Sequence, residues 1–407
     1  MEELDAGTLT SVVVIAGMAA LAPLVSDRLA RWLPVPSTVL EILLGILVGP
    51  AVLGLARTGT VVDAVAGFGL AMLFFLAGYE IEFARIRGAP VRRALGSWGG
   101  SLLLGLGIGA LLALLLGGGG KAALVFGLAL STTALGTILP IVRDSGVLPS
   151  RYGATIMAVG AVGEFGPIIM VALLLSGERP LHTTAVLLGF GAVAVAAAVV
   201  AMRPRSARLQ RMLTVTLGTS AQFAVRLSVL VVLAMVWLAT ELHLDLVLGA
   251  FAAGVVIRLV LASISRREAT VVESKLEGIG FGMLVPFFFV TTGVRFDLAA
   301  LLGSPSALAL LPVGLAAFLV VRGVPVAVAF RRVLPRPERT GLALYAATAL
   351  PLVVVVTGIG VGNGWLSSAT AAGLVGAAML SVLVFPLAAQ RVPAPAPAVG
   401  QATGRKP

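Results

Sequence analysis

One carboxylate, Glu164, stands in the middle of an apolar stretch that runs from Tyr152 to Leu175. A stretch of that length is long enough to cross a bilayer, which takes about 20 residues. Holding an ionisable group near the membrane midplane costs about 2.5–3.5 kcal/mol on insertion scales. Such a group is by default a candidate for carrying ions, the alternative being a Glu that only hydrogen-bonds a neighbouring helix. We therefore expect Glu164 to be the titrating group of an ion- or proton-coupled transporter.

Three other charged residues fall inside apolar stretches, namely Glu41, Glu80 and Arg322. Glu41 and Glu80 lie close enough to the ends of their stretches to reach the membrane interface. We expect them to make capping or interhelical contacts, with a secondary role in ion transport as the alternative. Arg322 lies deep in its stretch, and its guanidinium stays protonated in proteins. We expect it to offset the partial negative ends of interrupted helices, with simple packing as the alternative.

The composition is that of a polytopic membrane protein. Hydrophobic residues make up 59% of the 407-residue chain and charged residues only 12%, against about 25% charged in soluble domains. No Cys and only two His are present, so we expect no metal site and no cofactor. No nucleophile–base pair is visible, which argues against an enzyme. The net charge of +11 is spread over short links, so we expect no nucleic-acid partner.

Thirteen apolar stretches are long enough for us to predict thirteen transmembrane helices in an all-α fold. Of the 29 Lys and Arg, 24 fall in the links after odd-numbered spans, at the inner ends of those spans, or in the C-terminal tail. Four fall on the other side, and Arg322 lies within a span. Under the positive-inside rule this places the N-terminus outside and the C-terminus in the cytoplasm. Because the chain begins with an acidic segment and no basic n-region, we expect no cleaved signal peptide, and we assign the chain to the plasma (inner) membrane.

Two of the predicted spans carry the marks of interrupted helices. The fifth has the cluster Ser131, Thr132 and Thr133 at mid-depth, and the twelfth has Thr348 and Pro351. Pro removes a backbone donor and breaks or kinks a helix. Backbone freed at membrane depth is tolerated only where protein or a watery cavity satisfies it. Interrupted helices at matching positions of two repeats are a sequence pointer to a transporter's binding site.

The two interrupted spans occupy the same position in two six-helix halves of opposite membrane orientation. We therefore predict inverted repeats over about 9–175 and 221–389, joined by a linker helix at 183–202, within one transmembrane domain of residues 1–391. The Pro/Ala-rich tail, 392–407, has the composition of a disordered segment.

Four motifs in this order resemble the monovalent cation:proton antiporter superfamily, in particular the membrane domain of potassium-efflux and sodium/proton antiporters. They are the stretches Pro36–Pro50, Leu73–Glu80, Leu248–Gly254 and Phe287–Gly293. The resemblance covers Leu9 to Ala389, and it implies a thirteen-span fold in which a dimerisation domain carries a mobile core domain. It therefore also implies a homodimer and elevator-type alternating access.

Within that resemblance, Ser131–Thr133 matches the polar break of the family's first interrupted helix. Gly163-Glu164 matches the acidic pair of span 6, usually Asp-Asp, Asn-Asp or Gln-Asp, and Arg322 falls where the family places a buried Lys or Arg. This chain departs from the pattern in having Glu for the ion-carrying Asp, Gly before it, and Thr-Ala-Leu-Pro at the second break.

The sequence thus predicts proton-coupled antiport of a monovalent cation, Na⁺ or K⁺, with cation and proton competing for Glu164. We expect the carbonyls and hydroxyls of Ser131, Thr132 and Thr133 to bind the cation together with Glu164. One alternative is a sodium-coupled symporter for an organic anion, in which Arg322 or a half-helix N-terminus would bind the substrate carboxylate. Another is a channel or a membrane scaffold that does not transport, which would tolerate loss of the Glu164 carboxylate.

Overall fold

In the described part of the protein, seen in a computed structural model, the regular secondary structure is helical. The model describes residues 5–30, 35–80, 88–148, 150–175, 180–202, 222–261 and 266–392, and no strand occurs within them. The predicted all-α membrane fold is confirmed, because ten helices in these ranges are long and apolar enough to cross a membrane. Three shorter apolar helices accompany them. The exact number of membrane crossings stays a prediction, and all but the first residue of the Pro/Ala-rich tail lies outside the described residues.

The chain divides into two compact units, and each unit draws on both halves of the sequence. Unit 1 comprises Met1–Ile81 and Ile168–Ala299, and unit 2 comprises Glu82–Pro167 and Ala300–Pro407. The units are therefore not the two predicted repeats, which stay a prediction.

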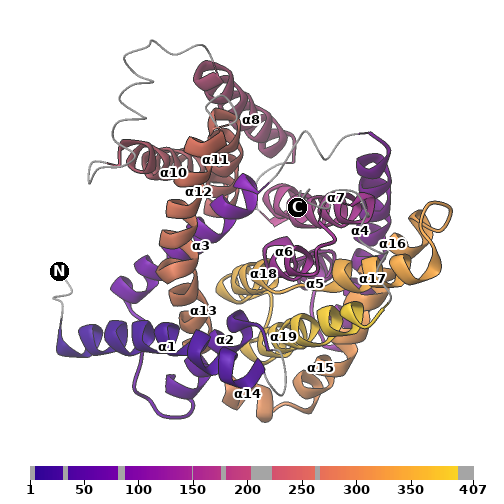
Figure 1. The fold of residues 1–407 in the computed structure, drawn as a ribbon. Helices are drawn as coiled ribbons and strands as arrows, with labels where there is room; N and C mark the ends of the chain where they lie inside the picture. Colours follow the sequence, from indigo (N-terminus) through magenta and orange to yellow (C-terminus); the bar gives the residue numbers. More distant parts are fainter. Residues whose placement is uncertain are drawn as a thin grey trace, which may run out of the picture. The chain divides into compact units, whose positions relative to one another are not determined.

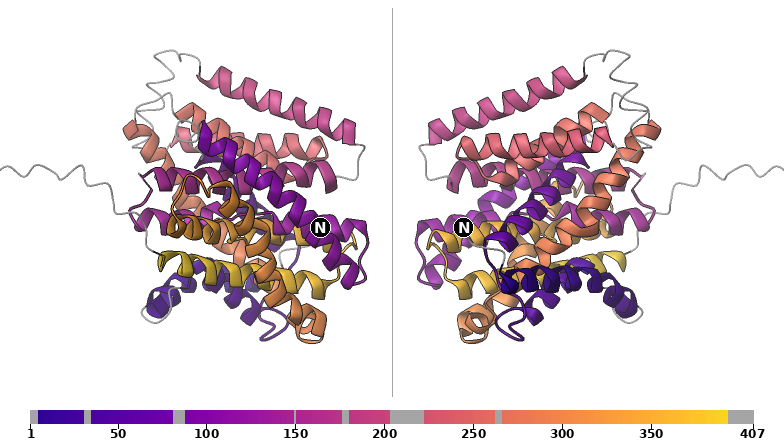
Figure 2. Two further views of the ribbon diagram at one scale, coloured as in Figure 1. Left: turned by 90° about the vertical axis from the view of Figure 1, so that its right-hand side faces the viewer. Right: turned by 90° about the vertical axis from the view of Figure 1, so that its left-hand side faces the viewer.

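Unit 1 is built from three N-terminal helices and the helices of the middle of the chain. Its members are α1 (Ala6–Ala30), α2 (Ser37–Val48), α3 (Thr60–Tyr79), α8 (Pro180–Met202), α10 (Phe223–Glu241), α11 (Leu246–Leu261), α12 (Arg266–Ile279), η1 (Gly280–Leu284) and α13 (Val285–Val294). Helices α1, α2 and α13 lie side by side (Figure 1). In the two views of Figure 2, α8 can be followed as one unbroken helix.

Glycines let two pairs of helices in unit 1 approach backbone to backbone. A Cβ at Gly45 of α2 would collide with the carbonyl of Val290 in α13, and one at Gly293 would collide with the carbonyl of Ile42. Gly78 of α3 and Gly254 of α11 form a second such contact. Membrane helices gain little from hydrophobic burial against each other, so close packing at small residues holds them together.

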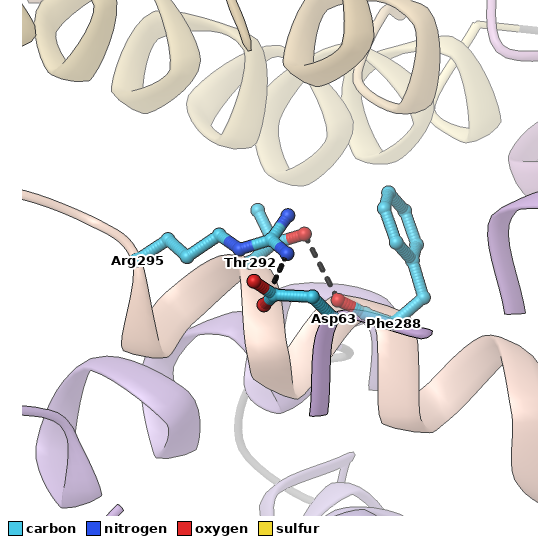
Figure 3. Close-up of polar contacts among 4 residues, drawn as sticks. All are labelled: Asp63, Phe288, Thr292 and Arg295. Carbon is cyan, nitrogen blue, oxygen red and sulfur yellow. Dashed lines mark hydrogen bonds and ion pairs between the residues drawn. The ribbon is translucent and has the colours of Figure 1, made fainter. Parts of the chain in front are cut away.

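An ion pair joins two helix ends at the surface of unit 1. Asp63 lies in the first turn of α3, and Arg295 directly follows the end of α13. Arg295 Nη2 donates a hydrogen bond to Asp63 Oδ1 at 2.6 Å (Figure 3). An acid at a helix N-terminus and a base at a C-terminus each complement the helix dipole. Both side chains are about half exposed, so the pair contributes at most about 1 kcal/mol.

Unit 2 contains the two interrupted helices. Its members are α4 (Ala89–Leu115), α5 (Gly120–Leu130), α6 (Leu135–Asp144), most of α7 (Arg151–Leu175), α15 (Pro305–Phe318), η2 (Leu319–Gly323), α16 (Val324–Ala329), α17 (Arg336–Ala347), α18 (Pro351–Gly362) and α19 (Ser368–Gln390). A cluster of buried apolar side chains joins α6, α7, α16 and α17, and it includes Leu135, Val159, Val326 and Ala346.

Candidate ion-binding site

The first interruption separates α5 from α6 at Ser131–Ala134, as the polar cluster predicted. The hydroxyls of Ser131 and Thr132 donate to the carbonyls of Leu128 and Ala129, at 2.9 and 2.8 Å. Short hydroxyl side chains compete in this way with the backbone bonds of a helix. All three hydroxyl residues of the cluster are at most 2% exposed. The break is therefore a buried, polar, non-helical stretch.

The second interruption separates α17 from α18 at Thr348–Leu350. Thr348 Oγ1 donates back to the carbonyl of Leu344 at 3.2 Å. Pro351 is the first residue of α18, where a helix lacks a partner for its N–H in any case. The N–H of Ala349 finds an acceptor in Ser381 Oγ of α19 at 3.0 Å. This break is therefore also satisfied by protein groups.

The two breaks meet each other inside unit 2. The N–H of Ala134 donates to the carbonyl of Thr348 at 2.8 Å, and Thr133 Oγ1 donates to the carbonyl of Ala346 at 2.6 Å. Two helix C-termini and two helix N-termini consequently converge on one buried place, where partial charges of both signs are available to an ion.

The helix that carries Glu164 is attached to this crossing through a proline. Pro167 in α7 has no N–H, so it cannot donate to the carbonyl four residues earlier, which is that of Gly163. The N–H of Thr133 donates to this carbonyl instead, at 2.9 Å. One backbone bond therefore links the first break to the residue next to Glu164.

Arg322 is fully buried and holds three elements of unit 2 together. Its Nε donates to Thr133 Oγ1 at 2.9 Å and its Nη1 to Ser101 Oγ of α4 at 3.1 Å. Its Nη2 lies 3.5 Å from the carbonyl of Val159 in α7. Arg322 itself sits in the π-helical turn η2, a kind of distortion that is frequent at functional sites. All three acceptors are neutral, so a permanent positive charge lies beside the crossing.

The absence of a side chain at position 163 makes room for that guanidinium. A Cβ at Gly163 would collide with Arg322 Nη2 and would lie 2.5 Å from Thr133 Oγ1. Gly160 and Gly166 stand one turn to either side on the same face of α7, where they receive Leu135 and the indole of Trp98. The three glycines form a shallow groove along the surface of α7, and the neighbouring side chains pack into it.

Glu164 lies just off this glycine face and is 5% exposed. Of the sequence-predicted residues, Thr133, Thr348 and Gly163 are linked at the crossing by the bonds described above, and Arg322 joins them through Thr133. Ser131 and Thr132 precede Thr133 in the same break, and their hydroxyls bond only within their own stretch. Pro351 begins the following helix. Glu41 and Glu80 belong to unit 1, where Glu41 is also buried.

Four residues of this arrangement were not singled out in the sequence, namely Trp98, Ser101, Pro167 and Ser381. Pro167 had a readable signal, since a proline exposes the carbonyl four residues before it. The others lie on different helices from their partners, and only the tertiary fold brings them into contact.

Comparison with known proteins identifies the family that has this architecture. Residues 16–392 match the model of the sodium/hydrogen exchanger transmembrane family. The chain belongs to this family. Among curated members, it is 28% identical over 336 residues to the candidate Na⁺/H⁺ antiporter YjbQ of Bacillus subtilis, covering 78% of this chain and 52% of YjbQ. It is 25% identical over 282 residues to the Na⁺/H⁺-K⁺ antiporter GerN of Bacillus cereus, covering 67% of this chain and 70% of GerN.

The exchanger fold is also seen in a solved structure. The sodium/proton antiporter MjNhaP1 of Methanocaldococcus jannaschii superposes with a TM-score of 0.69 and 15% identity, over 95% of this chain and 99% of that one. The chain therefore has the fold of a sodium/proton antiporter. It spans about half the length of YjbQ. As a member of the exchanger family it is a multi-pass membrane protein.

Proposed function

We propose that this chain exchanges a monovalent cation, Na⁺ or K⁺, for protons across a membrane. Its relatives are named as Na⁺/H⁺ and cation/H⁺ antiporters. The observation that carries the proposal is the bond from the Thr133 N–H to the Gly163 carbonyl, which fixes the first helix break next to Glu164. Among the described residues of unit 2, Glu164 is the only carboxylate in the middle of a span.

In the proposed cycle, Glu164 binds either a proton or a partly dehydrated cation. Ser131 and Thr132 donate their hydroxyl hydrogens to their own helix, so their oxygens keep lone pairs that can face a cation. Thr133 differs, because its hydroxyl already bonds Ala346 and accepts from Arg322; we propose that it holds the crossing in shape. Competition between the two ligands for one carboxylate couples their opposite movements.

Arg322 supplies a fixed positive charge in this cycle. It lies beside the C-terminal end of the α5 half-helix, where backbone carbonyls carry partial negative charge. We propose that it compensates this charge when Glu164 is protonated and no cation is present. We further propose that unit 2 is the mobile core domain of an elevator mechanism. We propose that unit 1 is the dimerisation domain, through which two copies of the chain contact each other in a homodimer.

Exchange in proteoliposomes tests the proposal. The purified protein is reconstituted with a pH-sensitive dye inside, and external Na⁺, K⁺ or Li⁺ is added. Wild-type protein should move protons outward when the cation gradient points inward. Glu164→Gln should abolish this signal while the protein still inserts and purifies, because Gln fills the same space and cannot titrate. Glu241→Gln, at the exposed end of α10, is the matched control and should exchange as wild type does.

Two results would contradict the proposal. Wild-type exchange by the Glu164→Gln variant would show that another group carries the proton. Sodium uptake that depends on an organic anion and ignores the proton gradient would favour the symporter. The three bonds that Arg322 makes within the protein count against the form of that alternative in which the guanidinium binds the substrate carboxylate.

A further inference from the structure

Trp98 contacts both the first helix break and the helix that carries Glu164. It lies on α4, and its Nε1–H donates to the carbonyl of Ser131 at 3.3 Å. Its ring lies in the place that a side chain at Gly166 would take, since a Cβ there would collide with the indole atoms Cε2 and Cζ2. One side chain thus connects α4 to the end of α5 and to α7, two residues beyond Glu164.

The carbonyl that Trp98 bonds is at a sensitive position. Ser131 caps the C-terminus of α5, where the last carbonyls of a helix have no intrahelical donor. Such carbonyls carry the negative end of the helix dipole, and they are the backbone groups most suited to bind a partly dehydrated cation. A carbonyl oxygen has two lone pairs, so one bond from an indole leaves the other lone pair for an ion and fixes its direction.

The same face of α4 carries a second polar contact to the site. Ser101 stands one helical turn after Trp98 and accepts from Arg322 Nη1 at 3.1 Å. Its own hydroxyl donates to the carbonyl of Ser97 at 3.0 Å. In contrast, Leu103 and Leu114 of α4 are about three-quarters exposed, as expected of a lipid-facing surface. Helix α4 therefore presents a polar strip with Trp98 and Ser101 to the break.

We propose that Trp98 is a positioning residue for cation binding, which fixes the Ser131 carbonyl as a ligand of the ion bound at Glu164. This inference rests on the proposed antiport function and adds a specific residue to it. Trp98 acts through the backbone of residue 131 and does not itself contact the ion. Its loss should therefore weaken cation binding and relax discrimination between ions of different size, while the rate at saturating cation stays close to that of wild type.

Two substitutions disturb the bond from Trp98 to Ser131 in different ways. Trp98→Phe keeps an aromatic ring and removes the N–H donor. Gly166→Ala keeps the indole and forces it away from its position against α7. Trp237→Phe is the matched control, because Trp237 is 62% exposed on α10 in the other unit. Each variant is reconstituted in proteoliposomes, and the exchange rate is measured against external Na⁺, K⁺ and Li⁺ concentration.

For Trp98→Phe we expect the half-saturating concentration of the preferred cation to rise by about two- to tenfold, the range that the net contribution of one hydrogen bond allows. The ratios among the three cations should move toward one. Gly166→Ala should do the same, and Trp98→Ala combined with Gly166→Ala should be no worse than Trp98→Ala alone, since the collision is then gone. Trp237→Phe should match wild type.

Several outcomes would overturn the proposal. The first is unchanged half-saturation and selectivity in Trp98→Phe while wild type exchanges normally. Another is a fall in maximal rate alone, which would assign Trp98 a purely structural role. If Trp98→Phe does not insert, Gly166→Ala decides by the same two measurements. A wild-type protein that exchanges no cation would instead refute the proposed function, so the two failures are distinguishable.

Discussion

At the scale of single residues, the most informative position is one without a side chain. Gly163 precedes Glu164, at a place where the antiporter superfamily usually has Asp, Asn or Gln. In this chain the guanidinium of Arg322 fills the space instead. Where the family resemblance places a neutral or acidic side chain on α7, this chain has a cation that reaches in from η2. The local chemistry of position 163 is therefore set by a residue far away in the sequence.

Gly163→Ala should consequently destabilise the protein and impair exchange. In an open helical position, replacing Gly by Ala stabilises by roughly 0.5–1 kcal/mol. Here the added methyl would displace Arg322 Nη2, and the bonds to Thr133 and Val159 would be strained or lost. Interhelical hydrogen bonds in membranes average about 0.6 kcal/mol each, so with the steric strain the variant should be less stable by about 1–3 kcal/mol.

The thermal unfolding temperature of the purified protein in detergent measures this effect. Gly107→Ala is the matched control, because nothing lies within 4 Å of a Cβ at that position of α4. The control should be neutral or slightly stabilised. If Gly163→Ala unfolds at the temperature of the control and exchanges cations normally, the contact between Arg322 and position 163 has no energetic importance.

At the scale of helices, the two interruptions could be predicted from the sequence, whereas the hydrogen bonds that connect them to other helices could not. The hydroxyl cluster at Ser131–Thr133 marks the first break correctly, and Pro351 marks the start of the helix after the second. Pro140, in contrast, lies within α6 and not at the break, so a proline by itself does not locate an interruption. Local competition for backbone bonds is readable from one stretch of sequence.

Contacts between helices are not readable in this way. Nothing in the sequence around Trp98 indicates that its indole reaches Ser131, and Ser101 is an ordinary serine in an apolar helix. The π-helical turn that holds Arg322 also depends on tertiary context, although a Pro at position 325 follows it. A second π-helical turn, η1, is likewise followed by Pro286. Each proline removes one backbone N–H from its helix, and the wider hydrogen-bond pattern of a π-helical turn just before it is consistent with that missing donor.

Pro167→Ala tests the docking of α7 to the first break. The new N–H at position 167 should bond to the Gly163 carbonyl within the helix, and so compete with the N–H of Thr133. We expect α7 to become more regular and its attachment to the break weaker. The maximal exchange rate should fall severalfold, with a smaller change in unfolding temperature.

Pro312→Ala is the control for the Pro167 variant, since Pro312 is exposed within α15 of the same unit. Its exchange rate should stay at the wild-type level. Equal rates for Pro167→Ala and wild type would mean that the bond from Thr133 to Gly163 survives the competition, or that the break does not need it for transport.

At the scale of the whole molecule, the number of titrating groups near the site sets the charge moved per cycle. Unit 2 offers Glu164 as its mid-span carboxylate within the described residues, and position 163 has no second one. Arg322 keeps its proton, because a guanidinium does not deprotonate in proteins. A chain with Asp-Asp and a titratable Lys has further groups that can release a proton. Under the proposed function, the described residues of unit 2 offer a single group that can load and unload a proton at mid-span.

We therefore expect one proton to exchange for one monovalent cation, with no net charge moved. The membrane potential contributes about 2.3 kcal/mol per elementary charge per 100 mV, so an electroneutral cycle should not respond to it. Proteoliposomes clamped at several potentials, with an ionophore for an ion that the protein does not carry, measure this directly. The cation gradient at which proton movement stops should be the same at every potential. A null point that shifts with potential would require a second titrating group, and the buried Glu41 of unit 1 would be the first residue to replace by Gln.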